Sequence, residues 1–88
     1  MITSKTIPSF WECYRELPDP VRKAAQKAFE NWKENPSHPS LRFKCIESKT
    51  HVWAIRITIG YRALCVFEGD TATWFWVGGH ADYEKLIK

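Results

Sequence analysis

Apolar side chains recur with a helical period near the start of the chain. From Phe10 to Leu17 they stand at i, i+3, i+4 and i+7, the spacing of one helix face. Ser9 is a candidate N-cap and Pro18 ends the pattern. The sequence therefore predicts a short first helix over residues 9–17, preceded by a weak strand at Ile2 to Thr6.

A second, longer helix is predicted directly after the first. Asp19-Pro20 reads as an N-cap followed by proline at the first helical position, and Asn35-Pro36 stops the helix at about Glu34. Small alanines indicate close packing against its neighbours. The apolar stripe consists of Val21, Ala24, Ala25, Ala28, Phe29 and Trp32.

After residue 40 the pattern changes to strands. LRFKCI alternates, with Leu41, Phe43 and Cys45 opposite Arg42, Lys44 and Ile46. A hairpin follows, then a turn at Glu68 to Asp70, then TATWFWVG, whose apolar residues on both faces predict a central strand covered on both sides. Gly78-Gly79 ends this strand, and HADYEKLIK closes the chain as a short helix. We therefore expect an α+β fold in which two N-terminal helices pack on a mainly antiparallel sheet of four to five strands.

The stretch HVWAIRITIGYRAL places two arginines in the hairpin. A two-residue loop would pair Ile57 with Arg62, whereas a three-residue loop, 59–61, would pair Thr58 with Arg62. The second register is predicted, because burying an unpaired charge costs several kcal/mol. Arg56 and Arg62 then share one face of the sheet.

Two interpretations of these arginines stay open at this level. Each can pair with a local carboxylate, such as Glu47 or Glu68, or extend to water. Alternatively, the two guanidinium groups, joined by Lys44 from the preceding strand, form a cationic face that binds phosphate.

Composition sets the class of protein. The 88 residues are 44% hydrophobic and 15% aromatic, which predicts one globular domain over residues 1–88. The net charge of +3 is compatible with nucleic acid. Three dispersed cysteines lack ligand or disulfide spacing and are expected to be reduced core residues. Without a signal or membrane segment we expect a cytoplasmic protein that needs no metal or cofactor.

The closing segment WFWVGGHADYEKL adds candidate chemistry. His80 and Tyr83 stand at i, i+3, on one face of the last helix. Histidine is a common general acid or base, and a tyrosine hydroxyl can donate to phosphate. The structural alternatives are a surface histidine near a helix start and a half-buried packing tyrosine.

Three segments together resemble the RelE/ParE superfamily of toxins from bacterial toxin–antitoxin pairs. They are NPSHPSLRFK (Asn35 to Lys44), VWAIRITIGYRAL (Val52 to Leu64) and WFWVGGHADYEKL (Trp74 to Leu86). The resemblance implies a helix pair on a small sheet with a concave cleft. For RelE-like members it implies a metal-independent endoribonuclease that cleaves mRNA, on or off the ribosome, and a cognate antitoxin protein as partner.

The resemblance also implies roles for particular residues. Arg62 matches the phosphate-binding arginine, Arg56 a basic strand position, and His80 a position of arginine or catalytic histidine. Tyr83 lies near the C-terminal tyrosine of some members.

One position departs from the RelE-like pattern. Ala54 stands where these enzymes often carry a second lysine, so Lys44, Lys49 and His51 are the candidates to supply the missing positive charge to RNA. Two other functions stay open: a ParE-like inhibitor of DNA gyrase, and a catalytically silent toxin-like domain that only binds protein.

Overall fold

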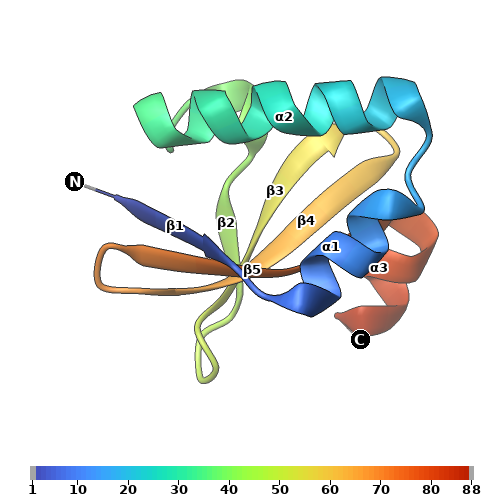
Figure 1. The fold of residues 1–88 in the computed structure, drawn as a ribbon. Coiled ribbons are helices and arrows are strands. Elements are labelled where there is room, and N and C mark those ends of the chain that lie inside the picture. Colours follow the sequence, from blue (N-terminus) through green and yellow to red (C-terminus); the bar gives the residue numbers. More distant parts are fainter. Residues whose placement is uncertain (1, 88) are drawn as a thin grey trace.

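The computed structural model describes residues 2–87, which form three α-helices, one 3-10 helix and five strands (Figure 1). In chain order these are β1 (Thr3–Thr6), α1 (Pro8–Arg15), α2 (Asp19–Glu34), η1 (Pro39–Leu41), β2 (Lys44–Glu47), β3 (Val52–Thr58), β4 (Tyr61–Glu68), β5 (Thr71–Gly79) and α3 (His80–Leu86). The predicted α+β class and element order are confirmed.

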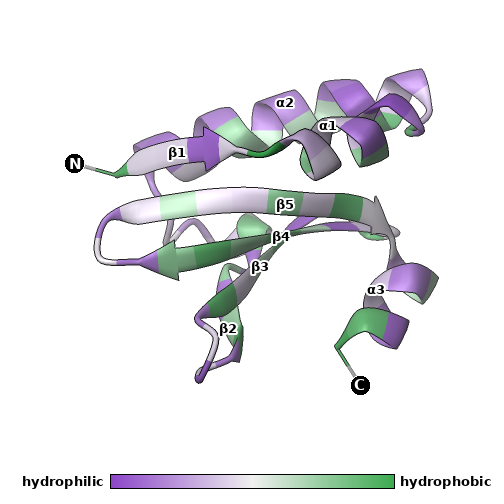
Figure 2. Ribbon diagram, turned by 60° about the horizontal axis from the view of Figure 1, so that its bottom comes forward, coloured by the Kyte–Doolittle hydropathy of each residue, from purple (hydrophilic) through white to green (hydrophobic). Residues whose placement is uncertain are grey.

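All five strands form one sheet in the order β1-β5-β4-β3-β2. Only the β1–β5 pair is parallel; the other pairs are antiparallel. Figure 2 shows α1 and α2 on one side of the sheet and α3 on the other. β5 is therefore an inner strand with helices on both sides, as its apolar pattern predicted.

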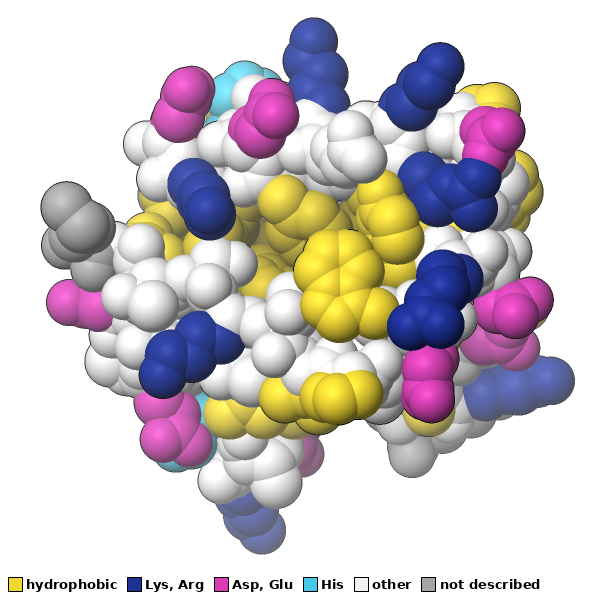
Figure 3. All heavy atoms as spheres, in the orientation of Figure 1, with side chains coloured by type: hydrophobic (Ala, Val, Ile, Leu, Met, Phe, Trp, Pro, Cys, Tyr) yellow, Lys and Arg dark blue, Asp and Glu magenta, His cyan; other side chains and the backbone are white. Residues whose placement is uncertain are grey.

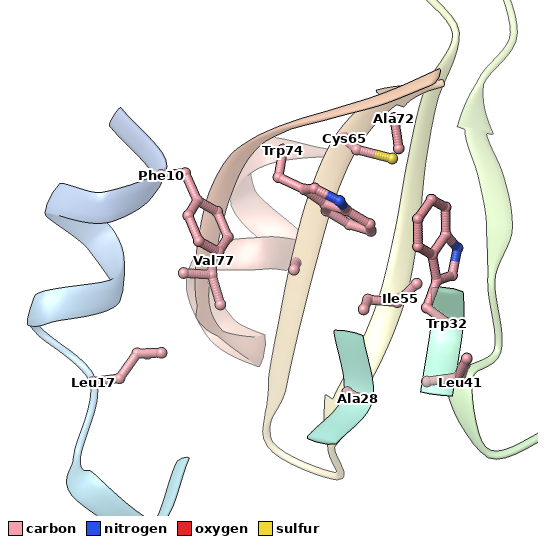
Figure 4. Packing of buried hydrophobic residues seen from close by; sticks show 11 residues of the cluster. Phe10, Leu17, Ala28, Trp32, Leu41, Ile55, Cys65, Ala72, Trp74 and Val77 are labelled. Atoms are coloured by element: carbon pink, nitrogen blue, oxygen red, sulfur yellow. The ribbon is translucent and has the colours of Figure 1, made fainter. Parts of the chain in front are cut away.

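The main core lies between the sheet and the α1–α2 pair, as Figure 4 shows. Trp32 of α2 is fully buried and meets Trp74 of β5 edge to face, with ring centroids 5.3 Å apart. Phe10, Leu17 and Ile55 complete the contact between the two layers. The side chains on the helical stripes thus bury against strand residues that alternate inward.

A smaller cluster lies on the opposite face of the sheet. Ala54 of β3 and Leu64 of β4 are cross-strand partners, and Tyr83 of α3 packs on them. α3 begins at the hairpin-loop end of this face, where the His80 N–H donates to the Gly60 carbonyl, and Arg56 and Arg62 are half-buried there.

Both predicted N-caps are wrong. Ile7 is the N-cap of α1, and the Ser9 hydroxyl instead donates to the carbonyl of Phe75, 2.8 Å away. Pro18 is the N-cap of α2, so Asp19 lies in the first turn, where it pairs with Arg22. In both cases the side chain that could have capped the helix contacts another group instead: a carbonyl of β5 for Ser9, and an arginine three residues later for Asp19.

The first predicted strand on the C-terminal half is shorter than its alternation suggested. Leu41 belongs to η1, and the strand begins only at Lys44 because Arg42 adopts a left-handed conformation, φ 47°. Cys45 is exposed and Cys13 half-buried, so only Cys65 is the fully buried cysteine that was expected. Burial raises the pKa of the Cys65 thiol to about 12.

None of the helices within residues 2–87 has the length and apolar character that crossing a bilayer requires.

Candidate functional site

The β3–β4 hairpin differs from both registers considered from the sequence. Its loop has two residues, Ile59 and Gly60, but Thr58 pairs with Tyr61 and Arg56 pairs with Arg62. Ile57 is an extra residue, a β-bulge that restores the alternation of faces. The predicted three-residue loop is therefore wrong, yet the predicted shared face is correct, and the two arginines are direct cross-strand neighbours.

Four cationic side chains converge on this face. A cavity of about 70 Å³, the basic pocket, is lined by Arg42, Lys44, Arg56, Arg62, Ala54, Ile55 and Tyr83. Lys44 on β2 is the cross-strand partner of Ala54, so its side chain starts beside this small residue, which also lines the pocket. The pocket thus has positive charge from three neighbouring segments and room at the centre.

These cations form no ion pair with a carboxylate of residues 2–87. The ion pairs within residues 2–87 are Asp19–Arg22 and His80–Glu84, and neither involves the basic pocket. Glu47 and Glu68, the carboxylates considered from the sequence, do not neutralise the arginines. Partial burial lowers the pKa of Arg62, and nearby Arg56 and Arg42 lower it further. The guanidinium stays charged at neutral pH, so the pocket favours an anion.

The loop backbone holds Arg62 in place. Its Nη1 donates to the carbonyl oxygens of Thr58 (2.7 Å), Tyr61 (3.0 Å) and Ile59 (3.3 Å). Its Nη2 and Nε make no hydrogen bond to the described protein, which leaves one edge of the planar fork for a ligand. The tight hairpin therefore orients the arginine before any ligand arrives.

Tyr83 closes the pocket from α3. The Arg62 Cζ lies 6.0 Å from the centre of its ring. Burial raises the pKa of the phenol; the Arg62 charge opposes this rise, and Glu84 adds to it. Because the pKa is raised above the ordinary value of about 10, the hydroxyl is a neutral donor at physiological pH.

His80 lies next to Tyr83 but does not line the basic pocket. The two ring centroids are 5.8 Å apart, and the His80 Nδ1 is 2.9 Å from Glu84 Oε1. Its backbone N–H donates to the Gly60 carbonyl, 2.8 Å away, which fixes the start of α3 against the hairpin loop. A carboxylate at Nδ1 leaves Nε2 as the ring atom for chemistry.

Lys49 and His51 lie apart from the basic pocket. Both belong to the β2–β3 loop, at the opposite end of β3 from Arg56 (bottom of Figure 1). Of the three candidates for the charge missing at Ala54, the structure brings only Lys44 to the pocket.

Two residues of the site were missed in the sequence. Arg42 alternates with Lys44, and this i, i+2 spacing was a signal that both lie on one side. Glu84 stands four residues after His80, the spacing of neighbours on a helix face. In residues 2–87 no three His, Cys, Asp or Glu side chains are grouped so that they could hold a metal ion.

A larger hollow lies on the other side of the molecule, between α2 and the β1–α1 segment (centre of Figure 3). It has about 420 Å³ and an aromatic lining that includes Trp11, Tyr14 and Phe29. Trp11 is 43% exposed there, whereas Trp32 of α2 is fully buried. This hollow suits an apolar partner rather than acid–base chemistry.

Comparisons with known proteins agree on one group. A sequence model described as ParE-like toxin domain matches residues 19–85. No curated protein matches the chain in sequence.

Solved structures with the same fold include several toxins. The chain is similar to the RelB–RelE antitoxin–toxin complex from Methanococcus jannaschii, at 19% identity and TM-score 0.75, covering 96% of this chain and 99% of that one. It is also similar to the YoeB/ParE toxin from Agrobacterium tumefaciens, at 15% identity and TM-score 0.70, covering 90% and 99%. The RelBE2 toxin–antitoxin complex from Mycobacterium tuberculosis matches at 17% identity and TM-score 0.70, covering 90% and 98%.

Proposed function

Because this chain belongs to the ParE-like toxin domain family, we propose that it is the toxin of a toxin–antitoxin pair and acts as an endoribonuclease on mRNA. The observation that carries the nuclease activity is the basic pocket, where Arg42, Lys44, Arg56 and Arg62 surround a small cavity without a carboxylate. Fixed cations of this kind stabilise the charge that develops on a phosphorane and require no metal.

The proposed reaction uses the cations of the basic pocket to hold the phosphate. The scissile phosphate binds in the basic pocket, with the free edge of the Arg62 fork on its non-bridging oxygens. The ribose 2′-oxygen attacks phosphorus, the bond from phosphorus to the 5′-oxygen breaks, and the products are a 2′,3′-cyclic phosphate and a 5′-hydroxyl. Negative charge on the oxygens rises during the attack, so the cations stabilise the transition state more than the ground state.

His80 and Tyr83 are the groups that move protons. His80 Nε2 accepts the proton of the 2′-hydroxyl, with Glu84 holding the ring at Nδ1. Tyr83, protonated because burial raises its pKa, donates to the departing 5′-oxygen. The cycle closes when the imidazolium loses its proton and the phenolate regains one; the centroids of the two rings are 5.8 Å apart.

The partner we propose is a protein antitoxin. Two of the similar structures are toxin–antitoxin complexes. An unneutralised cationic pocket and an exposed aromatic hollow are both surfaces that a wrapping partner with acidic and apolar side chains can cover.

Mapping of mRNA ends tests the proposed function. After induction of the toxin in cells without antitoxin, protein synthesis should stop, and mRNA should show clustered breaks with 5′-hydroxyl ends. Arrest with an intact message pool, a DNA-damage response and filamentation would instead identify a gyrase inhibitor, which the ParE-like family description makes the second candidate. Growth arrest with neither mRNA cleavage nor a DNA-damage response would favour a catalytically silent domain that only binds protein.

Variants of the proton-moving residues give a second prediction. Tyr83→Phe keeps the ring against Ala54 and Leu64 but removes the donor, and His80→Ala removes the base. Each should slow cleavage by about 100-fold, the usual worth of a positioned acid or base. Single-turnover cleavage of a labelled RNA measures this. Lys49→Ala, in the distant loop, should cleave at the wild-type rate, and wild-type rates in both test variants would remove them from the reaction.

A further inference from the structure

A second cavity, larger than the basic pocket, adjoins it. This flanking cavity has about 370 Å³ and is lined by Ala24, Lys27, Ala28, Asn31, Ser40, Leu41, Arg56, Ile57 and Thr58. Arg56 lines both spaces, so it is the wall between them. The lining residues come from α2, η1 and β3, and Figure 1 shows α2 crossing the ends of β3 and β4.

The rim of the flanking cavity carries polar side chains of the kinds that contact nucleotides. Lys27 and Asn31 stand four residues apart on α2 and therefore face the same way. Lys27 has no ion-pair partner in the described part of the chain. A lysine can bind a phosphate, and an asparagine amide offers both a donor and an acceptor to a base edge.

Ser40 adds an acceptor at the other rim. Its backbone N–H donates to His38 Nδ1 at 3.2 Å, which makes that ring nitrogen an acceptor. The Ser40 hydroxyl, 2.7 Å from the same nitrogen, then donates to it as well. The lone pairs of the Ser40 oxygen stay available to a ribose hydroxyl or a base amino group.

The floor of the flanking cavity is apolar and depends on small side chains. Ala24 and Ala28 lie on the inner side of α2, opposite Leu41 and the bulged Ile57. Longer side chains at these two helix positions would fill the space. An apolar floor with a polar rim suits a flat base with its polar edge at the rim.

We propose that the flanking cavity binds the nucleotide next to the phosphodiester held in the basic pocket, with Arg56 between the two. This inference rests on the proposed function, because it takes single-stranded RNA as the ligand. Lys27 and Asn31 are then binding residues for the RNA chain, and the flanking cavity contributes affinity and base preference.

NMR titration with two probes tests the proposal. Dimethyl phosphate has the diester charge and no nucleoside, and a 2′-O-methyl trinucleotide has nucleosides and cannot be cleaved. The wild-type protein should bind the trinucleotide at least about tenfold more tightly, the worth of one or two added polar contacts. Binding of the trinucleotide should also shift the NMR signals of the Asn31 side-chain amide, whereas dimethyl phosphate should leave these signals unchanged.

Two variants separate the cavities. Ala24→Leu fills the flanking cavity without changing charge, and Lys27→Ala removes a rim cation. Both should bind dimethyl phosphate like the wild type and lose most of the trinucleotide's advantage. Lys23→Ala is the matched control, since it removes an exposed cation from the same helix outside the cavity.

Each outcome has one meaning. The flanking site would be overturned if Ala24→Leu bound the trinucleotide with wild-type affinity. It would also be overturned if Lys27→Ala and Lys23→Ala lost equal trinucleotide affinity. In either case the proposal for the basic pocket would remain. If Arg62→Ala bound both probes like the wild type, the proposed function itself would fail, because the phosphate would not be held in the basic pocket.

Discussion

Arg62→Ala should lower RNA cleavage by about 100-fold or more, the loss that follows removal of one preorganised donor to developing charge. Arg62 is the best-oriented cation of the basic pocket, because three loop carbonyls hold its Nη1 and leave the other edge of the fork free. Growth arrest on induction should disappear with the activity. Single-turnover cleavage and colony counts measure the two effects.

The conservative variant separates charge from geometry. Arg62→Lys keeps the positive charge but cannot hold the loop carbonyls and present a planar fork at once, so its rate should lie between those of the wild type and the alanine variant. Circular dichroism and thermal melting control for the fold, since the loop loses three hydrogen bonds. Full activity in a folded Arg62→Ala protein would be fatal to the nuclease proposal.

Trp32→Ala should cause the largest loss of stability, about 3–5 kcal/mol in the free energy of unfolding. The side chain is fully buried and packs edge to face on Phe43, Phe67 and Trp74 at once. A domain of this size has a free energy of unfolding of roughly 5–15 kcal/mol in total, so the variant should keep only a fraction of the wild-type stability and melt at a clearly lower Tm. Urea unfolding followed by circular dichroism measures the change.

Two matched variants test the cause. Trp32→Phe keeps most of the apolar area and removes an indole N–H that has no partner inside the core, so it should cost clearly less than Trp32→Ala. Trp11→Ala deletes the same side chain at a site that is 43% exposed, and its loss should also be smaller. Equal losses at positions 11 and 32 would contradict the packing argument.

The periodicity of the chain was enough to place the elements. The α2 stripe ending in Trp32 and the doubly apolar β5 both required burial, and the observed helices and strands follow them. Local sequence signals such as helix N-caps were less reliable where a residue distant in sequence bound the same side chain. Ser9 caps nothing because the Phe75 carbonyl, 66 residues away in sequence, accepts its hydroxyl hydrogen.

Part of the basic pocket could be predicted from the sequence. The cost of burying a charge placed Arg56 and Arg62 on one face, and this conclusion held although the loop was wrong. Lys44 and Arg42 could be grouped by alternation, but their distance from the arginines depends on the β2–β3 register and on the left-handed turn at Arg42.

The sequence by itself determined the α+β order, the buried faces and the shared face of the two arginines, because hydrophobic period and the cost of buried charge act on each segment locally. Only the tertiary structure decided that a β-bulge at Ile57 makes the arginines direct neighbours, that Tyr83 joins them from α3, and that Lys49 and His51 stand apart from the pocket. These depend on how separate elements dock, and docking is set by packing of the whole core rather than by any one segment.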